Sequence, residues 1–582
     1  MFLQSFHIKG FRCIREAHLT FNPGLNILIG ENNAGKTAVI DALRICLSYG
    51  NQRRDIYVSE RDFFIDRADP GAELQDIEFH LVFTMVDPEE AGLFHDMLSV
   101  DADGAVLQLH FRYYLWEGNS TRRVRYRVWG GDKEGQAVAP EVLDLLYFVY
   151  LGALRDAAQS LRPVRGNKLG ELLANLEPDK EKRDDLAGRV HNVLGGDEDW
   201  QDLIGQGKQR INEHVNATSI EGKEPRLSVD FLPFEFERIV DNLRIQTEVF
   251  DPNALSSPDD QQYFDLHQNG LGYNNLIYTA TVLGHLKRRR DVEPEAYMAL
   301  LIEEPEAHLH PQLQSTFFQY LSTLDSMRFQ TFISSHSPSI TAKADLNALV
   351  VLQNVEQEVR SLAIRESELS RDNQTYLSKF LDVTKSQLLF ASGVVLVEGI
   401  SEALLLPIFS RMLGTDYDIT RRGIELVNIG GVAFEHFARL FNSEDPARRL
   451  SCRCCILTDD DRGDTEQESP RAARALALTG GLLRVELAEH TFEYELFVTE
   501  GNRKVMLEVL AEISVKSAKS VAQEQSPEGM ALHFVDRLRR LKAKSDFAHR
   551  LSVLLQECKK ARDVFTVPLY IERGLKWVAK GE

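Results

Sequence analysis

The chain has 582 residues, a mass of 66.1 kDa and a formal net charge of −21 at pH 7. This length excludes a single hydrophobic core, and the acidic balance excludes a surface that is basic throughout. The N-terminus lacks the apolar run of a signal peptide, and no stretch approaches the ~20 apolar residues of a membrane span, so we expect a cytoplasmic protein with no membrane contact.

The first elements are expected to be strands that lead into a phosphate-binding loop. Strand patterns cover residues 6–12 and 17–21, and an apolar run over 25–29 feeds into the segment Gly30-Glu31-Asn32-Asn33-Ala34-Gly35-Lys36-Thr37. Residues 38–47 continue at helical period. A glycine-rich loop between a buried strand and a helix is the setting that phosphate binding requires.

The middle of the chain mixes strand and helix patterns. Alternating runs at 76–83 and 106–115 predict antiparallel strands. The segment from 166 to 240 is charged and helical, and we interpret it as an insertion. A second block from 266 to 340 contains the very apolar run 298–302.

The C-terminal part is expected to form a domain of its own. A polar connection around 355–390 leads to an apolar strand over 393–397. Strand and helix patterns then alternate to about residue 500, which predicts a parallel sheet. From residue 501 onward the sequence is mostly helical.

The loop spacing Gly-x4-Gly-Lys-Thr indicates a nucleotide site. Backbone N–H groups of such a loop surround phosphate oxygens, Lys36 reaches the outer phosphates, and Thr37 offers its hydroxyl to magnesium. The candidate nucleotide-binding residues of the loop are Asn32, Asn33, Gly35, Lys36, Thr37 and Ala38.

Two later strands supply candidate partners for this loop. The apolar strand 300–302 ends in Glu303, which could hold Mg²⁺ through a water, and Glu304, which could orient the attacking water. The strand over 332–335 ends in His336, which could sense the terminal phosphate. An acidic solvated turn is the alternative interpretation of the first segment, and a structural histidine that of the second.

These motifs resemble an ABC-type ATPase of the branch that includes chromosome-maintenance and recombination ATPases. The resemblance implies nucleotide held between two heads, with a signature loop from one head completing the other's site. Gly270 and Gly272, within residues 268–276, occupy the signature position, although the usual serine is missing. Arg12 matches a family position near the nucleotide, and Glu303 replaces the commoner aspartate.

A second set of acidic residues lies far downstream. The strand 394–397 delivers Glu398 at its end and Glu402 on the first turn of the next helix, so both face one way. The strand 453–458 ends in Asp459 and Asp461, which project to one side if the extended conformation persists. Carboxylates gathered in this way suit Mg²⁺ or Mn²⁺, and two such metals could activate water at a phosphodiester.

The order and spacing of these carboxylates resemble a Toprim domain, and a Toprim domain behind an ABC ATPase resembles the OLD (overcoming lysogenization defect) family. The resemblance extends to residues 491–496, 544–548 and 568–571, and it implies Glu493 as a further metal ligand and Lys544 as the group that stabilises the scissile phosphate. Lys542 lies two residues away, and a solvated helix is the alternative interpretation of this segment.

The expected fold class is therefore α/β: an ABC-type ATPase head with a helical insertion, a Toprim domain with a Rossmann-like parallel sheet, and a helical C-terminal region. The expected divisions are 1–165 and 241–350 for the ATPase, 166–240 for an insertion that mediates dimerisation, 351–390 for a linker, 391–500 for the Toprim nuclease domain and 501–582 for its helical C-terminal part.

The predicted function is that of an ATP-binding, metal-dependent DNA endonuclease or nickase in phage defence or DNA repair. The resemblance implies double-stranded DNA as substrate, a homodimer or tetramer, and a superfamily-one helicase partner as in Gabija-type systems. Two alternatives stay open. One is a recombination or repair mediator whose Toprim domain does not cleave, and the other is a regulatory ATPase whose Toprim domain is a docking scaffold.

Overall fold

The computed structural model divides the chain into two units. The first comprises Met1–Phe148, Tyr297–Glu306 and Pro311–Glu582, and the second comprises Val149–Ala296 and Ala307–His310. The residues that the structure describes are 1–49, 56–69, 71, 74–85, 92, 94, 97–101, 104–117, 122–131, 133–135, 138–153, 161–164, 167–177, 179–219, 225, 227–248, 263–292, 296–307, 309–323, 329–355, 358–431, 433–460 and 469–582.

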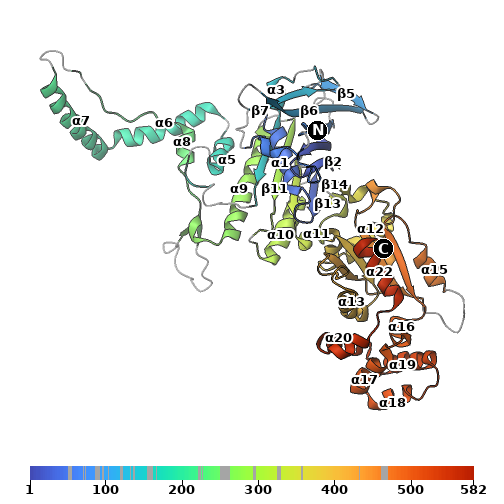
Figure 1. Ribbon diagram of the computed structural model, residues 1–582. Helices are drawn as coiled ribbons and strands as arrows, with labels where there is room; N and C mark the ends of the chain where they lie inside the picture. The colour runs from blue at the N-terminus through green and yellow to red at the C-terminus, as the bar shows by residue number, and fades with distance from the viewer. Residues whose placement is uncertain are drawn as a thin grey trace. The chain divides into compact units, whose positions relative to one another are not determined.

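An antiparallel sheet opens the first unit (Figure 1). Its strands run in the order β2-β1-β4-β6-β5, and β7 pairs with β6. Their bounds are β1 Phe2–Phe11, β2 Ile14–Thr20, β4 Ile77–Thr84, β5 Leu98–Asp101, β6 Gly104–Glu117 and β7 Arg122–Gly130. Along β4, Ile77, Phe79, Leu81 and Phe83 are buried and the residues between them are half-buried. This alternation, which places one face of the strand on the core, confirms the strands predicted at 76–83 and 106–115.

A second sheet carries the glycine-rich loop. Within the first unit its strands run in the order β14-β13-β3-β12-β11. The bounds in this region are β3 Leu25–Gly30, α1 Lys36–Leu47, α3 Pro140–Leu143, β8 Leu146–Leu151, β11 Tyr297–Glu303, α10 Pro311–Ser322, β12 Gln330–Ser335, α11 Pro338–Thr341, β13 Leu349–Val355 and β14 Glu358–Ala363. β3 pairs in parallel with β12 and with β13, and every residue of β3, β11 and β12 is buried. Burial on both faces explains why β11 is apolar from Tyr297 to Ile302 without alternation.

Residues 351–390, which the sequence predicts to be a polar linker, contain regular structure. β13 and β14 belong to the nucleotide sheet, and α12 (Arg371–Phe380) follows them. β14 is the edge strand in this order, where Glu358 and Arg360 are exposed and Val359 between them is buried. This half-polar pattern is the reason that the segment reads as a connection.

A parallel sheet in the order β16-β15-β17-β18 forms the core of the C-terminal part. Its elements are β15 Gly393–Val397, α13 Ile400–Leu413, β16 Ile424–Asn428, α14 Phe434–Ala438, β17 Arg453–Asp459, α15 Pro470–Leu476, β18 Leu483–Ala488 and α22 Leu569–Lys580. α22 packs against β17, where a Cβ on Gly574 would lie 2.8 Å from Cys455 Sγ. The sheet confirms the prediction of parallel strands, and with the ATPase elements it confirms the α/β class.

The helical tail is also confirmed. Its helices are α16 Phe492–Val498, α17 Asn502–Ile513, α18 Val515–Val521, α19 Pro527–Leu541, α20 Lys544–Glu557 and α21 Lys559–Val564. Figure 1 shows α16–α20 grouped together. Phe534 on α19 lies between Phe497 and Phe547, with ring centroids 4.6 and 5.0 Å apart. These rings belong to the same hydrophobic core as Val395 and Leu457 of the parallel sheet, so the tail and the sheet share one core.

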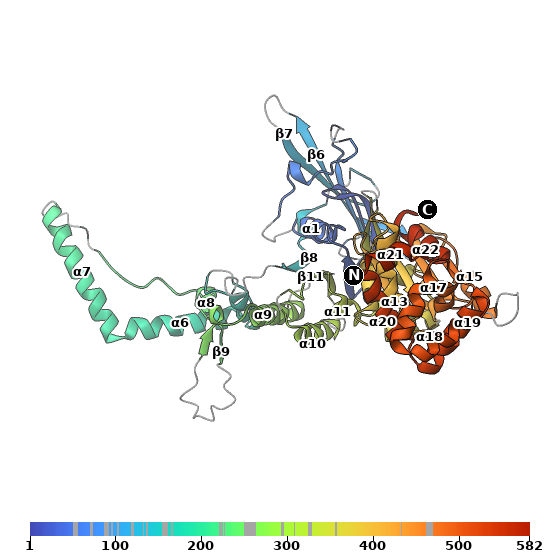
Figure 2. The ribbon, with the colours of Figure 1, turned by 60° about the horizontal axis from the view of Figure 1, so that its bottom comes forward.

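The second unit is mainly helical. Its elements are α5 Lys168–Leu176, α6 Lys180–Gly196, α7 Glu198–Thr218, α8 Phe236–Asp241, β9 Gln246–Glu248, β10 Tyr263–Asp265 and α9 Leu271–Val292. α5 packs against α8 and α9, whereas α6 and α7 extend away from them and α7 buries no residue (Figure 2). Within the described ranges, no helix combines the length and the apolar character needed to cross a bilayer.

Candidate nucleotide and metal sites

The glycine-rich loop connects β3 to the N-terminus of α1. Asn33 and Gly35 adopt left-handed φ angles of 64° and 97°, and these conformations turn the chain within the loop. Gly30 sits so close to the neighbouring strand that a Cβ would lie 2.0 Å from the carbonyl oxygen of Leu352. Asn32, Asn33 and Thr37 are exposed, and Gly35 and Ala38 are buried. The loop therefore presents its polar residues to solvent at the start of a helix, where anions are favoured.

Lys36 is buried and folds back on the loop. Its Nζ donates to the carbonyl oxygens of Gly30 at 2.7 Å and Glu31 at 2.6 Å. Burial lowers the pKa of Lys36 to about 8, although the charges of Glu304, Glu306 and Glu31 oppose the decrease. A cation desolvated in this way is stabilised by an anion that enters the loop.

The ends of β11 and β12 lie beside the end of β3. Glu303 pairs in register with Ser334, and Ser335 pairs with Ile29, so the three parallel strands end at one edge of the sheet. Glu303 is buried. The next residue, Glu304, has a φ of 43°, which is strained for a residue with a side chain.

Glu304 and His336 face one another across this edge. Glu304 Oε1 lies 3.5 Å from His336 Nε2. Burial and then the charge of Lys36 lower the pKa of His336, and Glu304 raises it. The structure thus brings Lys36, Glu304 and His336 within electrostatic reach of one another.

Glu306 is a residue of this edge that the sequence reasoning did not select. Its Oε1 accepts from Ser335 Oγ at 2.8 Å and from the backbone N–H of His336 at 2.9 Å. Burial raises the pKa of Glu306. Its position two residues beyond Glu304, in an acidic motif, is the sequence feature that could have identified it as a residue of the site. Its hydrogen bonds hold the backbone at His336.

Arg12 is held by two carboxylates of its own region. Its Nη1 lies 2.5 Å from Asp41 Oδ2 on α1, and its Nε lies 2.8 Å from Asp62 Oδ1. Its φ of 51° belongs to the turn between β1 and β2. Gly270 and Gly272 lie in the second unit, where Gly270 precedes α9 and Gly272 is in its first turn.

The first downstream carboxylate, Glu398, follows β15 and is surrounded by donors. Its Oε1 accepts from the Thr458 hydroxyl and from the backbone N–H of Asp459 at 3.1 Å, and it forms an ion pair with Arg471 on α15. β15 and β17 are paired in parallel, with Val397 opposite Leu457. The pairing of these strands therefore brings Glu398 to Asp459.

Three further groups converge on the same edge. Glu402, on the first turn of α13, is buried, and its pKa is raised to about 7 by burial first and then by the charges of Glu493 and Glu398. Glu493, on the first turn of α16, is also buried and forms an ion pair of 2.8 Å with Lys544 Nζ. The charge of Lys544 opposes the increase at Glu402.

The second half of the Asp-x-Asp pair lies outside the described residues, because the structure describes no residue from 461 to 468, which includes Asp461. Asp459 is the last residue of β17. The pKa of the buried Tyr570 is raised mainly by burial and then by negative charges that include those of Asp459, Glu402 and Glu493. Lys542 is exposed in a left-handed conformation at the end of α19. Of the two lysines, Lys544 is the one in contact with the carboxylates.

The donor set fits divalent metals of the hard class. Four carboxylates come from the ends of two strands and from two helix first turns, and the pKa of one of them, Glu402, is raised to about 7 by burial first and then by the charges of Glu493 and Glu398. Oxygen ligands of this kind are those that Mg²⁺ and Mn²⁺ prefer. Glu398, Glu402, Asp459 and Glu493 are the described residues that could hold them.

Arg471 and Thr458 are the residues of this site that sequence reasoning missed. Thr458 adjoins Asp459, so its position was a signal. Arg471 follows the segment 461–468, and nothing in its local pattern distinguishes it from a helix-surface arginine.

A direct hydrogen bond connects the glycine-rich loop to the residue before β15. Ser392 Oγ, immediately before β15, donates to Glu31 Oε1 of the glycine-rich loop at 2.8 Å. A second link runs from the neighbouring strand, where Gln353 Oε1 accepts from the backbone N–H of Ser451 at 2.6 Å. The loop is thus tied to the strand that carries Glu398 at its far end.

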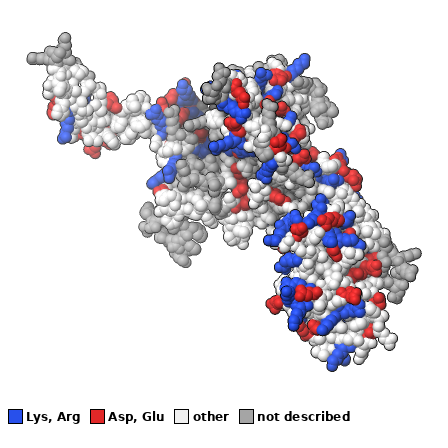
Figure 3. Space-filling view, in the orientation of Figure 1, with Lys and Arg blue, Asp and Glu red and all other residues white. Residues whose placement is uncertain are grey.

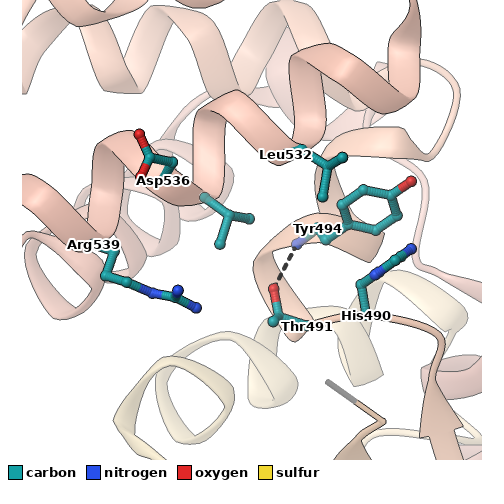
Figure 4. Close-up of a pocket in the computed structure, with 7 residues that line it drawn as sticks. His490, Thr491, Tyr494, Leu532, Asp536 and Arg539 are labelled. Atoms are coloured by element: carbon teal, nitrogen blue, oxygen red, sulfur yellow. Dashed lines mark hydrogen bonds between the residues drawn. The ribbon is translucent and has the colours of Figure 1, made fainter. Parts of the chain in front are cut away.

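A cavity of about 480 Å³ adjoins the helix that carries Glu493 (Figure 4). Arg539 and Asp536 line it from α19, and His490, Thr491 and Tyr494 line it from the opposite side. The Thr491 hydroxyl accepts from the backbone N–H of Tyr494 at 3.3 Å and so caps α16. The cavity combines a cation, an imidazole and a phenol ring.

Comparison with known families agrees with this arrangement. A model described as an AAA domain matches residues 5–119, and one described as an AAA ATPase domain matches residues 147–341. A third, described as the TOPRIM domain of overcoming lysogenization defect protein-like sequences, matches residues 389–461. These domains imply ATP binding and the use of a divalent metal.

Three relatives match most of the chain. An OLD nuclease of Thermus scotoductus is 26% identical over 466 residues, 74% of this chain and 78% of that protein. An uncharacterized protein of Escherichia coli, YbjD, is 25% identical over 79% of this chain and 80% of that protein. Endonuclease GajA of Bacillus cereus is 22% identical over 78% of this chain and 74% of that protein. The predicted resemblance is thereby confirmed: AAA ATPase regions precede an OLD-like TOPRIM domain in this chain, and its relatives include proteins named OLD nuclease and endonuclease GajA.

Proposed function

We propose that this protein is an ATP-binding, divalent-metal-dependent DNA endonuclease or nickase that acts in phage defence or DNA repair. One observation supports the proposal: Glu398 and Asp459 stand at the ends of two neighbouring parallel strands, and the pKa of the nearby Glu402 is raised to about 7 by burial first and then by the charges of Glu493 and Glu398. Buried like charges destabilise a fold unless a cation joins them. The nuclease and endonuclease names of two relatives agree with this reading.

In the proposed mechanism the carboxylates hold Mg²⁺ or Mn²⁺, with Asp461 as a further ligand. The metals, when bound, supply Lewis-acid activation of water and stabilise the leaving oxygen of the phosphodiester. Arg471 and Lys544 neutralise Glu398 and Glu493 in the metal-free protein. Lys544, which is 40% exposed, is then available to donate to the scissile phosphate once its carboxylate partner has turned to the metal.

ATP is proposed to bind at the glycine-rich loop. Lys36 exchanges its two carbonyl acceptors for the outer phosphates, and Thr37 and Glu303 hold the accompanying Mg²⁺. Glu304 orients the attacking water, while His336 contacts the terminal phosphate. Arg12, Asn32, Asn33, Gly35 and Ala38 surround the nucleotide, and Gly270 and Gly272 of a second head complete the site. Because the signature lacks its serine, we expect slow hydrolysis.

The contact between Glu31 and Ser392 is proposed to transmit the state of the nucleotide site. Phosphates entering the loop displace Lys36 from the carbonyl oxygen of Glu31, and this change reaches Ser392 through the Glu31 side chain. Ser392 adjoins the start of β15, and Glu398 follows its end. Nucleotide binding therefore adjusts the position of a metal ligand.

Double-stranded DNA is proposed to approach the TOPRIM domain locally. Figure 3 shows basic side chains interspersed with acidic ones over the C-terminal helices, so the contact surface is confined in spite of the charge of −21. Arg539, in the cavity beside Glu493, is placed to contact a phosphate next to the metal site. His490 and Tyr494 offer rings for the adjoining nucleotide.

The helices α6 and α7 are proposed to join two copies of the chain into a homodimer or, by pairing of dimers, a tetramer. Val193, Trp200, Leu203 and Ile211 on these helices expose between 43% and 73% of their surface. Apolar side chains gathered on one extended arm mark a protein contact. A helix pair with no buried residue on α7 needs such a partner to be stable.

The decisive experiment is plasmid cleavage with Mg²⁺ or Mn²⁺, with and without ATP. We expect Glu398→Ala to abolish cutting while ATP binding is retained, and Lys36→Ala to alter the response to nucleotide. Glu500→Ala, which changes an exposed glutamate of the same domain, is the matched control and should cut like the wild type. Undiminished cutting by Glu398→Ala would refute the assignment, and binding of ATP without any cutting would favour a mediator with a non-cleaving TOPRIM domain.

A further inference from the structure

A row of imidazoles crosses one face of the antiparallel sheet, away from both sites described above. His18 on β2 is in register with His7 on β1, His7 with His80 on β4, and His80 with His110 on β6. The rings of His7 and His18 stack at 3.9 Å with an angle of 4°. Residues in register on one face of a sheet are nearest neighbours, so the four histidines form one line.

The exposed end of this row contains a carboxylate as well. Glu16 Oε1 lies 2.9 Å from His7 Nε2 and 3.7 Å from His18 Nε2. All three ligand atoms lie within 4.8 Å of one another, and theirs is the only such histidine, cysteine or carboxylate group found among the described residues. Two ring nitrogens and one carboxylate oxygen thus lie close together beside β1 and β2.

From this geometry we propose that His7, His18 and Glu16 form a binding site for a divalent transition metal ion of the zinc class, with solvent as the fourth ligand. Tetrahedral Zn²⁺, with bonds of about 2.0 Å, places its ligand atoms about 3.3 Å apart. The distances of 2.9 and 3.7 Å bracket that value. Rotation of the 71% exposed His18 ring out of its stack on His7 would bring both Nε2 atoms to one ion.

The chemistry of the three groups selects this class of metal. Imidazole nitrogen is a poor ligand for Mg²⁺ and a good one for Zn²⁺, Co²⁺ and Ni²⁺. Glu16 supplies one negative charge. The site is therefore distinct in metal preference from the carboxylate cluster of the TOPRIM domain.

Metal binding here has a structural consequence for the turn that follows. β1 and β2 are joined by the turn that carries Arg12, and the three ligands come from both strands. An ion held across the pair resists separation of the strands and so keeps Arg12 beside Asp41 and Asp62. Stabilisation follows the concentration of the ion by mass action.

The test uses the full chain carrying Glu398→Ala, so that metal binding in the TOPRIM domain is weakened in every sample. Zn²⁺ is titrated by calorimetry, and Co²⁺ is followed by its visible absorption, which distinguishes nitrogen and oxygen ligands from the thiolates of the six free cysteines. The variants are His18→Gln, which alters an exposed side chain, and Glu16→Gln. His214→Ala, an exposed histidine on α7, is the matched control.

We expect one Zn²⁺ site per chain to be lost in His18→Gln, weakened at least about tenfold in Glu16→Gln, and unchanged in His214→Ala. The thermal midpoint should rise with Zn²⁺ in the parent and in the control, but not in His18→Gln. Identical titrations of the parent and His18→Gln would overturn the proposal and leave a hydrogen-bonded His–Glu–His cluster. Because cleavage is not measured, this result does not depend on the proposed nuclease function.

Discussion

Replacing Glu402 by glutamine should stabilise the metal-free protein while destroying its activity. The side chain is buried, and its pKa is raised from 4.5 to about 7 by burial and by Glu493 and Glu398. The folded state therefore holds the proton more tightly than the unfolded state does. The difference, at about 1.4 kcal/mol per pH unit, amounts to ~3 kcal/mol against folding once the carboxylate is ionised.

The sign of this effect fixes its pH dependence. Below pH 4.5 the carboxyl is protonated in both states and contributes nothing. Between pH 4.5 and about 7 its destabilising effect grows, and above pH 7 the effect is complete. Glu402→Gln removes the charge and keeps the shape of the side chain. The free energy of unfolding should therefore increase by ~3 kcal/mol at pH 8 and by less than about 1 kcal/mol at pH 5.

The assay is urea unfolding at pH 8 and pH 5 in EDTA, followed by fluorescence. The same measurement in Mg²⁺ should show a much smaller gain at pH 8, because the cation then stabilises the ionised wild-type site. Glu425→Gln is the matched control, because burial alone raises the pKa of Glu425. The increase in the free energy of unfolding that this variant shows should be the same with and without Mg²⁺. An equal gain for Glu402→Gln at both pH values, or none at pH 8, would refute the reasoning.

Three further outcomes follow from the same contacts. Lys544→Met should lower the cleavage rate by about 100-fold or more, because Lys544 contacts Glu493 at the metal site. Lys542→Met, which changes an exposed lysine, should cleave within about twofold of the wild-type rate. Equal losses for the two variants in single-turnover assays would contradict the assignment of Lys544. Ser392→Ala removes the hydrogen bond to Glu31 and should reduce the ATP-dependent change in cleavage rate by a factor of about 2 to 10, with ATP affinity measured as the control. Arg539→Ala should weaken DNA binding equally for different sequences and lower its salt dependence by about one charge, and a salt dependence that does not change would exclude the phosphate contact.

Local patterns were sufficient to predict the elements that carry the two sites. Apolar runs that end in polar or charged residues predict the strands before the glycine-rich loop and before Glu398. The structure has β3 and β15 at these positions. The parallel sheets followed from the alternation of strands and helices. These features depend on neighbours in sequence, which is why sequence reasoning reached them.

Contacts between distant segments were not predictable in this way. Arg471 approaches Glu398 only because α15 returns to the end of β15, and its sequence neighbourhood does not distinguish it. Glu31 meets Ser392 across 361 residues. The linker predicted over 351–390 begins within β13, and its neighbour β14 reads as a connection because it is an edge strand with exposed charges. Each of these cases depends on tertiary packing that leaves no periodic trace.

The central position of β3 has a consequence for how the protein is made. Both of its hydrogen-bonding neighbours, β12 and β13, are encoded about 300 residues later, beyond the whole of the second unit. While the ribosome translates that interval, β3 has neither of these two strands to pair with. β3 can complete its place in the nucleotide sheet only after residue 355 of β13 has been synthesised, so a chain that stops earlier lacks a neighbour of the strand that leads into the glycine-rich loop.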